Sequence, residues 1–231
     1  MILDKEGPKS DLILEVARDV CRTLGVSPAP EIVSWQDEYN TFVSRFSRSG
    51  GGRPVTPDFP VIDKNRILLK PLMQGTLEPE EWRPLLASSL IFYRQLRRQN
   101  HRGVRLRVSA ILLALGILLV LAVGPNSPLP ATLRTYFFVF VTVISIVATW
   151  GILIQYNIRL ILLADKKAAE VVGRERMLNV LQKLDLLRLR DIQEGKSLNW
   201  IGYNDLPRLP KRIENIQNFP IYETSKQKPG R

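Results

Sequence analysis

Histidine and cysteine are almost absent from this sequence, whose 231 residues include one of each, His101 and Cys21. A single cysteine cannot form an internal disulfide, and its place in an expected helix suits a reducing compartment. A single histidine cannot build a metal site that requires two histidines, and no clustered carboxylates take their place. The sequence therefore predicts no disulfide framework and no bound metal or other cofactor.

Acidic residues are outnumbered, because 33 Lys and Arg residues face 22 Asp and Glu residues and give a formal net charge of +11. Such an excess predicts an acidic partner, either anionic lipid headgroups or nucleic acid. The N-terminus lacks a basic segment followed by an apolar core, so we expect no cleavable signal peptide. Membrane insertion would then be directed from inside the chain.

Two long apolar runs without a charge are the most informative features that are present. The first, Val108–Val123, follows Arg107, whose long side chain can reach back to the membrane surface and lengthen the usable span. The second, Tyr136–Ile154, has aromatic residues near both ends, where a bilayer meets water. Both runs are typical of transmembrane helices, and the alternative is a pair of buried helices in a soluble core.

The segment between the two runs contains three prolines and Gly124, which cannot continue a helix. It therefore predicts a tight antiparallel hairpin. We divide the chain into an N-terminal cytoplasmic half over 1–103, a first transmembrane helix over 104–124, an external turn over 125–135, a second transmembrane helix over 136–154, and a C-terminal cytoplasmic helical half with an irregular tail over 155–231.

An arginine cluster without any acidic residue precedes the first apolar run. Its members are Arg94, Arg97, Arg98, Arg102, Arg105 and Arg107. The connecting turn has only Arg134, so the positive-inside rule places both termini in the cytoplasm and the turn outside, as in a multi-pass protein of the cell membrane. We expect the cluster to bind anionic headgroups of membrane lipids. A nucleic-acid partner is disfavoured, because the cluster lies against the membrane and lacks interleaved aromatic residues.

The first hundred residues predict helices around a small sheet. An amphipathic helix is expected from Asp11 to Gly25. Short β-like runs at Glu31–Trp35 and Arg66–Leu69 suggest two strands of one small sheet. The sequence therefore favours a mainly α fold with a small β-sheet, an α+β class.

Further helices are expected on both sides of the membrane segments. One begins near Glu78, where Pro79 suits a first helical position, and Pro84 should disturb its early part. Two more are expected after the second apolar run, separated by Gly173. The tail contains several prolines and predicts irregular structure.

Four local patterns occur in an order that resembles a known family. They are LGVSPAPEIVSWQDEYNTFVS, the helix TLEPEEWRPLLASSLIFYRQ, the stretch LADKKAAEVVG and the C-terminal LPRLPKRIENI. Together they resemble the HtpX-like and CAAX prenyl protease family of membrane zinc metallopeptidases, over about Leu12 to Ile216. The residues that agree with the family's motifs include Asn40, Phe42, Ala164, Asp165, Pro207 and Arg212.

The departures from the family fall on its chemistry. The family's active-site helix carries Ala-His-Glu-x-x-His, and a later helix carries Glu-x-x-Ala-Asp. Ser88 and Ser89 stand where the first ligand histidine and the general-base glutamate would be. Phe92 stands at the second histidine and Ile161 at the ligand glutamate. The resemblance therefore implies a zincin-like fold interrupted by a transmembrane hairpin, with every metal ligand lost.

A serine nucleophile is the alternative chemistry at Ser88 or Ser89. It would need a positioned base, and the nearest basic residues in sequence are arginines, which stay protonated. We expect both serines to be small packing residues instead. Asp165, without a metal-bound histidine, is expected to hold a backbone or lysine partner, and Phe92 and Ile161 are large enough to fill the vacated space.

The sequence thus predicts a pseudopeptidase rather than an enzyme. We expect a non-catalytic, metallopeptidase-like integral membrane protein that acts as a binding scaffold or as a regulatory partner of another membrane protein. An accessory structural subunit of a larger membrane complex is the first alternative. An active membrane metallopeptidase is the second, and the missing ligands argue against it.

Overall fold

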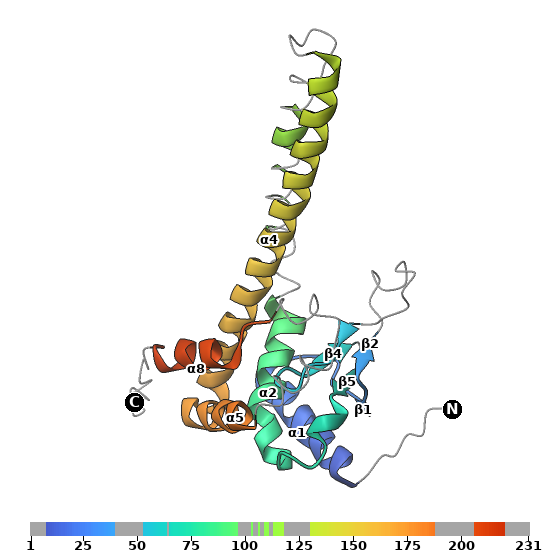
Figure 1. Ribbon diagram of the computed structural model, residues 1–231. Coiled ribbons are helices and arrows are strands. Elements are labelled where there is room, and N and C mark those ends of the chain that lie inside the picture. Colours follow the sequence, from blue (N-terminus) through green and yellow to red (C-terminus); the bar gives the residue numbers. More distant parts are fainter. Residues whose placement is uncertain are drawn as a thin grey trace, which may run out of the picture.

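The computed structural model describes most of the chain: residues 8–39, 53–63, 65–96, 103, 106, 109–110, 113–117, 130–187 and 206–219. Helices dominate these residues, and a small three-stranded sheet lies beside them (Figure 1). This confirms the mainly α fold with a small sheet. A single long helix projects from a globular part in which the other elements gather.

Helix α1, Pro8–Leu24, packs one face on the core. Its buried side chains follow a helical spacing and are Ile13, Val16, Ala17, Val20 and Cys21. The helix ends as expected at Gly25, whose φ of 62° favours glycine. It begins three residues before the predicted cap, because Pro8 is well suited to a first helical position. Burial raises the pKa of the Cys21 thiol, which makes it less reactive.

The sheet has the strand order β1-β5-β4. Strands β1, Ile32–Trp35, and β5, Arg66–Leu69, pair in parallel, as two strands of one predicted sheet should. The antiparallel edge strand β4, Val61–Asp63, was not predicted, because it is only three residues long and directly follows a proline-rich segment. A separate antiparallel pair joins β2, Glu38–Tyr39, to β3, Arg53–Pro54.

The helix expected near Glu78 begins with a 3-10 turn, η3, over Pro79–Glu81. The backbone N–H of Glu78 donates to the Glu81 carboxylate at 2.8 Å, which completes a capping box. The α-helical stretch α2, Trp82–Leu90, starts later, as the proline at 84 predicted. It continues as the π-helical η4, Ile91–Leu96, and a short 3-10 turn, η2, lies upstream over Pro71–Met73.

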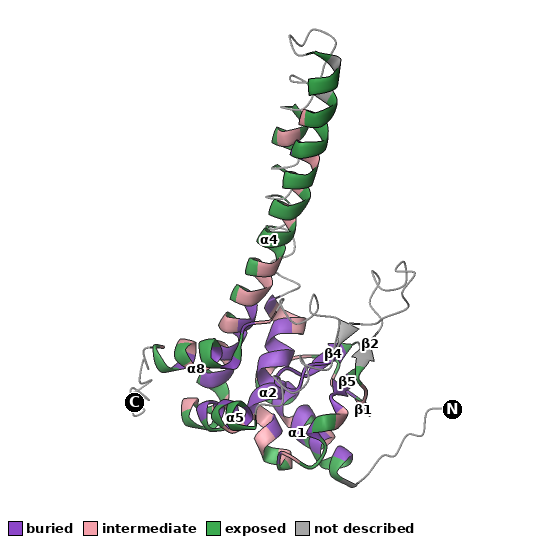
Figure 2. Cartoon of the chain, in the orientation of Figure 1, coloured by how far each residue is buried: buried purple, intermediate pink, exposed green. Residues whose placement is uncertain are grey.

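Helix α4 runs without a break from Ala131 to Val172, 42 residues in all. The predicted boundary after the second apolar run is therefore absent, because no glycine or proline interrupts the chain between Ile152 and Val172. Its apolar part is exposed, as the mostly green ribbon in Figure 2 shows, and α4 is long and apolar enough to cross a membrane. Burial resumes near its C-terminal end, at Leu160 and Ile161.

The first predicted transmembrane helix lies mostly outside the described residues. Those of its residues that the structure does describe, 106, 109–110 and 113–117, are helical. Within the described part of the chain, α4 is the one helix that meets the length and hydropathy of a membrane span. The first transmembrane helix, and with it the expected hairpin, therefore stays a prediction.

The C-terminal helices complete the globular part. After Gly173, with φ of 102°, α5 runs over Arg174–Leu186, and α8 covers Leu209–Gln217. Both pack on the last turns of α4, together with α2. A single large hydrophobic core joins these helices to α1 and the sheet.

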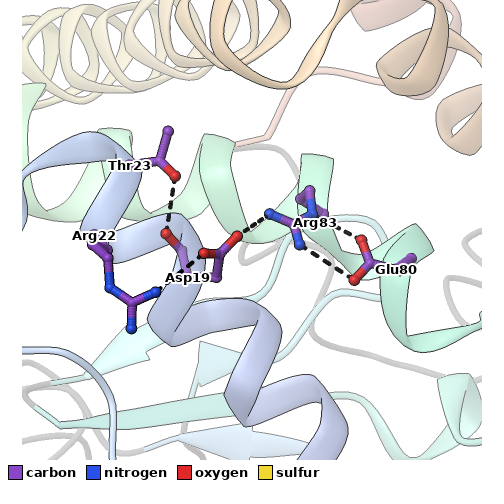
Figure 3. A network of polar contacts seen from close by, with 5 residues as sticks. All are labelled: Asp19, Arg22, Thr23, Glu80 and Arg83. Carbon is purple, nitrogen blue, oxygen red and sulfur yellow. Dashed lines mark hydrogen bonds and ion pairs between the residues drawn. The ribbon is translucent and has the colours of Figure 1, made fainter.

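An ion-pair network fastens α1 to the start of α2 (Figure 3). Arg83 donates to Glu80 at 2.8 Å and also pairs with Asp19 of α1. The hydrogen bonds from Arg83 lower the pKa of both carboxyls below their ordinary values. Lys183 of α5 forms a similar ion pair with Glu81, with Nζ 2.7 Å from Oε2. All three helices are therefore held together by carboxylates that are stabilised in their charged form.

We predict that Arg83→Met lowers the melting temperature at pH 7 and that this deficit shrinks in acid. A depressed carboxyl pKa contributes stability that is present above the unfolded pKa of about 4 and is lost as pH falls through the folded pKa. Thermal melts of wild type and variant from pH 7 to pH 3 measure this. Lys211→Met is the control, because it removes one positive charge from an exposed residue of α8. It should not show this pH-dependent deficit. A deficit that stays constant down to pH 3 would contradict the prediction.

Candidate functional site

A fully buried polar cluster occupies the place where the sequence predicted a degenerate metal site. Ser88 comes from α2, Asp165 from α4, Arg212 from α8 and Asp58 from the segment before β4. Each of the four is at most 1% exposed. Buried charges are costly unless they are paired and hydrogen-bonded, so the geometry of this cluster decides whether the core is stable.

Asp165 is the centre of the cluster. Its Oδ2 accepts from Arg212 Nε at 2.8 Å and its Oδ1 from Arg212 Nη2 at 2.9 Å, a bidentate pair. The Ser88 hydroxyl donates to the same Oδ1 at 2.6 Å. Both carboxylate oxygens of Asp165 are therefore hydrogen-bonded, and the hydroxyl proton of Ser88 is engaged in its hydrogen bond to Asp165.

The other side of the Arg212 guanidinium contacts Asp58. Nη1 donates to the Asp58 carbonyl at 2.8 Å and lies 3.3 Å from its Oδ2. Burial alone would lower the pKa of Arg212, but the carboxylates of Asp165 and Asp58 outweigh it and raise that pKa. One guanidinium thus faces two carboxylates from opposite sides, and the Phe59 ring lies 5.4 Å from its centre.

The structure brings together two residues that the sequence singled out for other reasons, Asp165 and Arg212. The backbone or lysine partner expected for Asp165 was wrong. Its partners are Arg212 and Ser88, because α8 places an arginine between α4 and the segment before β4. Asp58 was missed altogether, since an aspartate in a proline-rich segment carries no sign of burial.

The remaining positions of the expected site also lie in the core. α2 and α4 run in opposite directions in Figure 1, and the Ser88–Asp165 bond fixes their register. Phe92 lies one turn after Ser88, and Ile161 one turn before Asp165. Both are buried in the hydrophobic core, where Phe92 packs edge-on against Phe59 with ring centres 5.5 Å apart.

Other predicted positions have mixed outcomes. Ser89 and Ala164 are completely buried, and the Ser89 hydroxyl has no hydrogen-bond partner within the described residues. Pro207 is buried at the entry to α8. Arg94 lies in η4. The predicted residues outside the described part of the chain are Asn40, Phe42, Arg97, Arg98, His101, Arg102, Arg105 and Arg107.

The cluster is better suited to holding helices together than to catalysis. A serine nucleophile requires a base that can accept its proton. Asp165, whose carboxylate accepts from the Ser88 hydroxyl, is already paired with two N–H groups of Arg212. No set of three or more His, Cys, Asp or Glu side chains is arranged to hold a metal ion in the described ranges.

No family model, curated protein or solved structure matches this chain. The resemblance to the HtpX-like family therefore stays a prediction from the sequence motifs.

We predict that Arg212→Met destabilises the protein by about 3–5 kcal/mol, because it leaves two buried carboxylates without a cation. Chemical unfolding of wild type and variant measures the difference. Adding Asp165→Asn to Arg212→Met should recover part of the loss, since it removes one of the unpaired charges. A variant within 1 kcal/mol of wild type would mean that Arg212 does not carry this part of the core.

Proposed function

We propose that this chain is a non-catalytic, metallopeptidase-like membrane protein that acts by binding another membrane protein, as a scaffold or regulatory partner. The observation that carries the proposal is the buried bond from Ser88 to Asp165, with Arg212 on the same carboxylate. In the family that the motifs resemble, the position of Ser88 holds a zinc-ligand histidine. Here a hydrogen bond that requires no metal joins α2 to α4, and an ion pair joins the same carboxylate to α8.

The placement of the motif residues supports this assignment. Ser88 and Asp165 were aligned with two separate family motifs. They are 77 positions apart in the sequence, and Ser88 Oγ lies 2.6 Å from Asp165 Oδ1. Phe92 and Ile161, aligned with the other ligand positions, are buried and apolar. The fold can therefore keep the arrangement of helices while the chemistry of a zinc site is lost.

The membrane assignment rests on α4. Its exposed apolar stretch suits a bilayer core of about 30 Å at 1.5 Å per residue. With the first apolar run as a second span, the chain forms a hairpin with both termini in the cytoplasm. The arginine cluster before that run would then lie at the cytoplasmic surface and bind anionic headgroups.

An accessory subunit of a larger membrane complex is the second candidate. Apolar side chains are exposed along α4, among them Phe140, Ile144, Val147 and Trp150. Helices of a larger complex could cover them as well as lipid does. Co-purification in a mild detergent separates the two functions: a complex of fixed stoichiometry favours the subunit, and varied weak partners favour the scaffold.

We predict that the protein purified without chelator carries well below one zinc per chain and that added zinc leaves its melting temperature unchanged. The matched control restores the three aligned ligands and the general base in one variant with Ser88→His, Ser89→Glu, Phe92→His and Ile161→Glu. Its melting temperature should rise with zinc, because metal binding to the folded state stabilises it. Metal analysis and thermal melts measure both proteins.

Two results would contradict this assignment. One equivalent of zinc that resists dialysis of the wild type and raises its melting temperature would restore the peptidase hypothesis. A restored variant that folds, as judged by circular dichroism, and ignores zinc would show that the four positions are not those of a metal site.

We predict opposite labelling of the turn and the tail by an impermeant thiol reagent on intact cells. In a Cys21→Ser background, Asn126→Cys should react and Lys226→Cys should not, because the positive-inside rule places the turn outside. Permeabilised cells serve as the control, in which both should react. Labelling of the tail but not the turn in intact cells would reverse the topology.

A further inference from the structure

A groove between α1 and the segment leading into α2 lies at the end of the globular part away from the exposed length of α4 (Figure 1). It has a volume of about 460 Å³. An adjoining cavity of about 240 Å³ shares Pro79 with it and reaches toward two tryptophans, Trp35 and Trp82. Neither belongs to the buried cluster around Asp165.

The groove is acidic in a strongly basic chain. Four carboxylates line it, those of Glu15, Asp19, Glu78 and Glu80, together with one guanidinium, that of Arg83. Arg83 pairs with Asp19 and Glu80, as Figure 3 shows, and Arg22 lies near Asp19. Glu15 and Glu78 make no ion pair within the described residues. Their two charges are therefore available to a cation from outside.

The adjoining cavity is mainly apolar, with Lys9 and Gln74 also on its lining, and it has one buried donor. Trp35 and Trp82 meet edge-to-face at 6.1 Å between ring centres, and Ile13 and Leu77 complete the apolar lining. Ser10 also lines the cavity and is only 5% exposed. Its oxygen accepts from Trp35 Nε1 at 3.1 Å, and its own proton has no acceptor among the residues that the structure describes. A carbonyl group from a ligand would satisfy that donor.

The spacing of these features fits an extended peptide. Ser10 and Glu15 are five residues apart on α1, about 7.5 Å along the helix axis and about 140° apart around it. Two residues of extended chain span about the axial distance, and a long lysine or arginine side chain covers the lateral offset. A segment with its apolar side chain in the tryptophan cavity therefore places the cation of a residue two positions away beside Glu15.

From this arrangement we infer that the groove binds a short extended segment of a protein partner, with an apolar side chain in the tryptophan cavity and a lysine or arginine beside Glu15 and Glu78. The Ser10 hydroxyl donates to a backbone carbonyl of the segment. A bare metal ion is a poorer occupant, because no three carboxylates of the described residues are arranged as ligands. The groove stands apart from the buried cluster, so the inference does not require the chain to be a pseudopeptidase.

A dye-labelled peptide tests the inference with the full chain in nanodiscs of neutral phosphatidylcholine. The probe Lys-Ala-Leu-Ala-Lys, blocked at its C-terminus, offers a cation two residues to either side of leucine. Binding is followed by fluorescence anisotropy, and binding to empty nanodiscs is subtracted. We expect saturable binding, at least fivefold weaker for Glu-Ala-Leu-Ala-Glu and for a probe with glycine in place of leucine.

Charge reversal locates the site. Glu15→Lys should weaken binding of the basic probe at least fivefold, because it places a cation where the lysine binds. Glu214→Lys makes the same change on an exposed position of α8 and should stay within twofold of wild type. Melting temperatures check that both variants fold. Absence of saturable binding, equal binding of the acidic probe, or equal losses in the two variants would overturn the inference.

Discussion

The bidentate contact between Arg212 and Asp165 is the interaction on which the globular part depends most. It joins residues 47 positions apart, and the same guanidinium reaches Asp58, 154 positions away. Removing the charges of Asp165, Arg212 and Asp58 from water costs free energy. The helices must therefore be close enough for the hydrogen bonds among these residues to offset that cost. Helix α8, near the end of the described chain, is therefore part of the core and not an appendage to it.

The sequence predicted those elements whose signals are local. A short β-like apolar run identified Arg66–Leu69 as a strand, and Gly25 marked the end of α1, since each depends on a few neighbouring residues. The continuity of α4 was missed because the composition changes from apolar to charged after residue 154. A helix ends at breakers or caps rather than at a change of polarity, and none lies there.

The candidate site was predicted in part. The motif alignment selected Ser88, Asp165 and Arg212 separately, and their side chains do meet. Which partner Asp165 holds was beyond a reading of the sequence, because a contact between α4 and α8 depends on how both helices pack. Asp58 shows the same limit more strongly, since only the fold converts an aspartate of a proline-rich loop into a buried counter-ion.

The unbroken course of α4 fixes a rotational relation between its two ends. At about 100° per residue, 18 residues complete five full turns, so Val147 points in the same direction as Asp165. Because Asp165 is locked to Arg212 and Ser88, the face that α4 turns toward its surroundings near Val147 is set by the core. One residue inserted after Ile154 would lengthen the helix by only about 1.5 Å, yet it would rotate that face by about 100°. The number of residues between Asp165 and any position in the exposed half of α4 therefore determines the direction in which that side chain points.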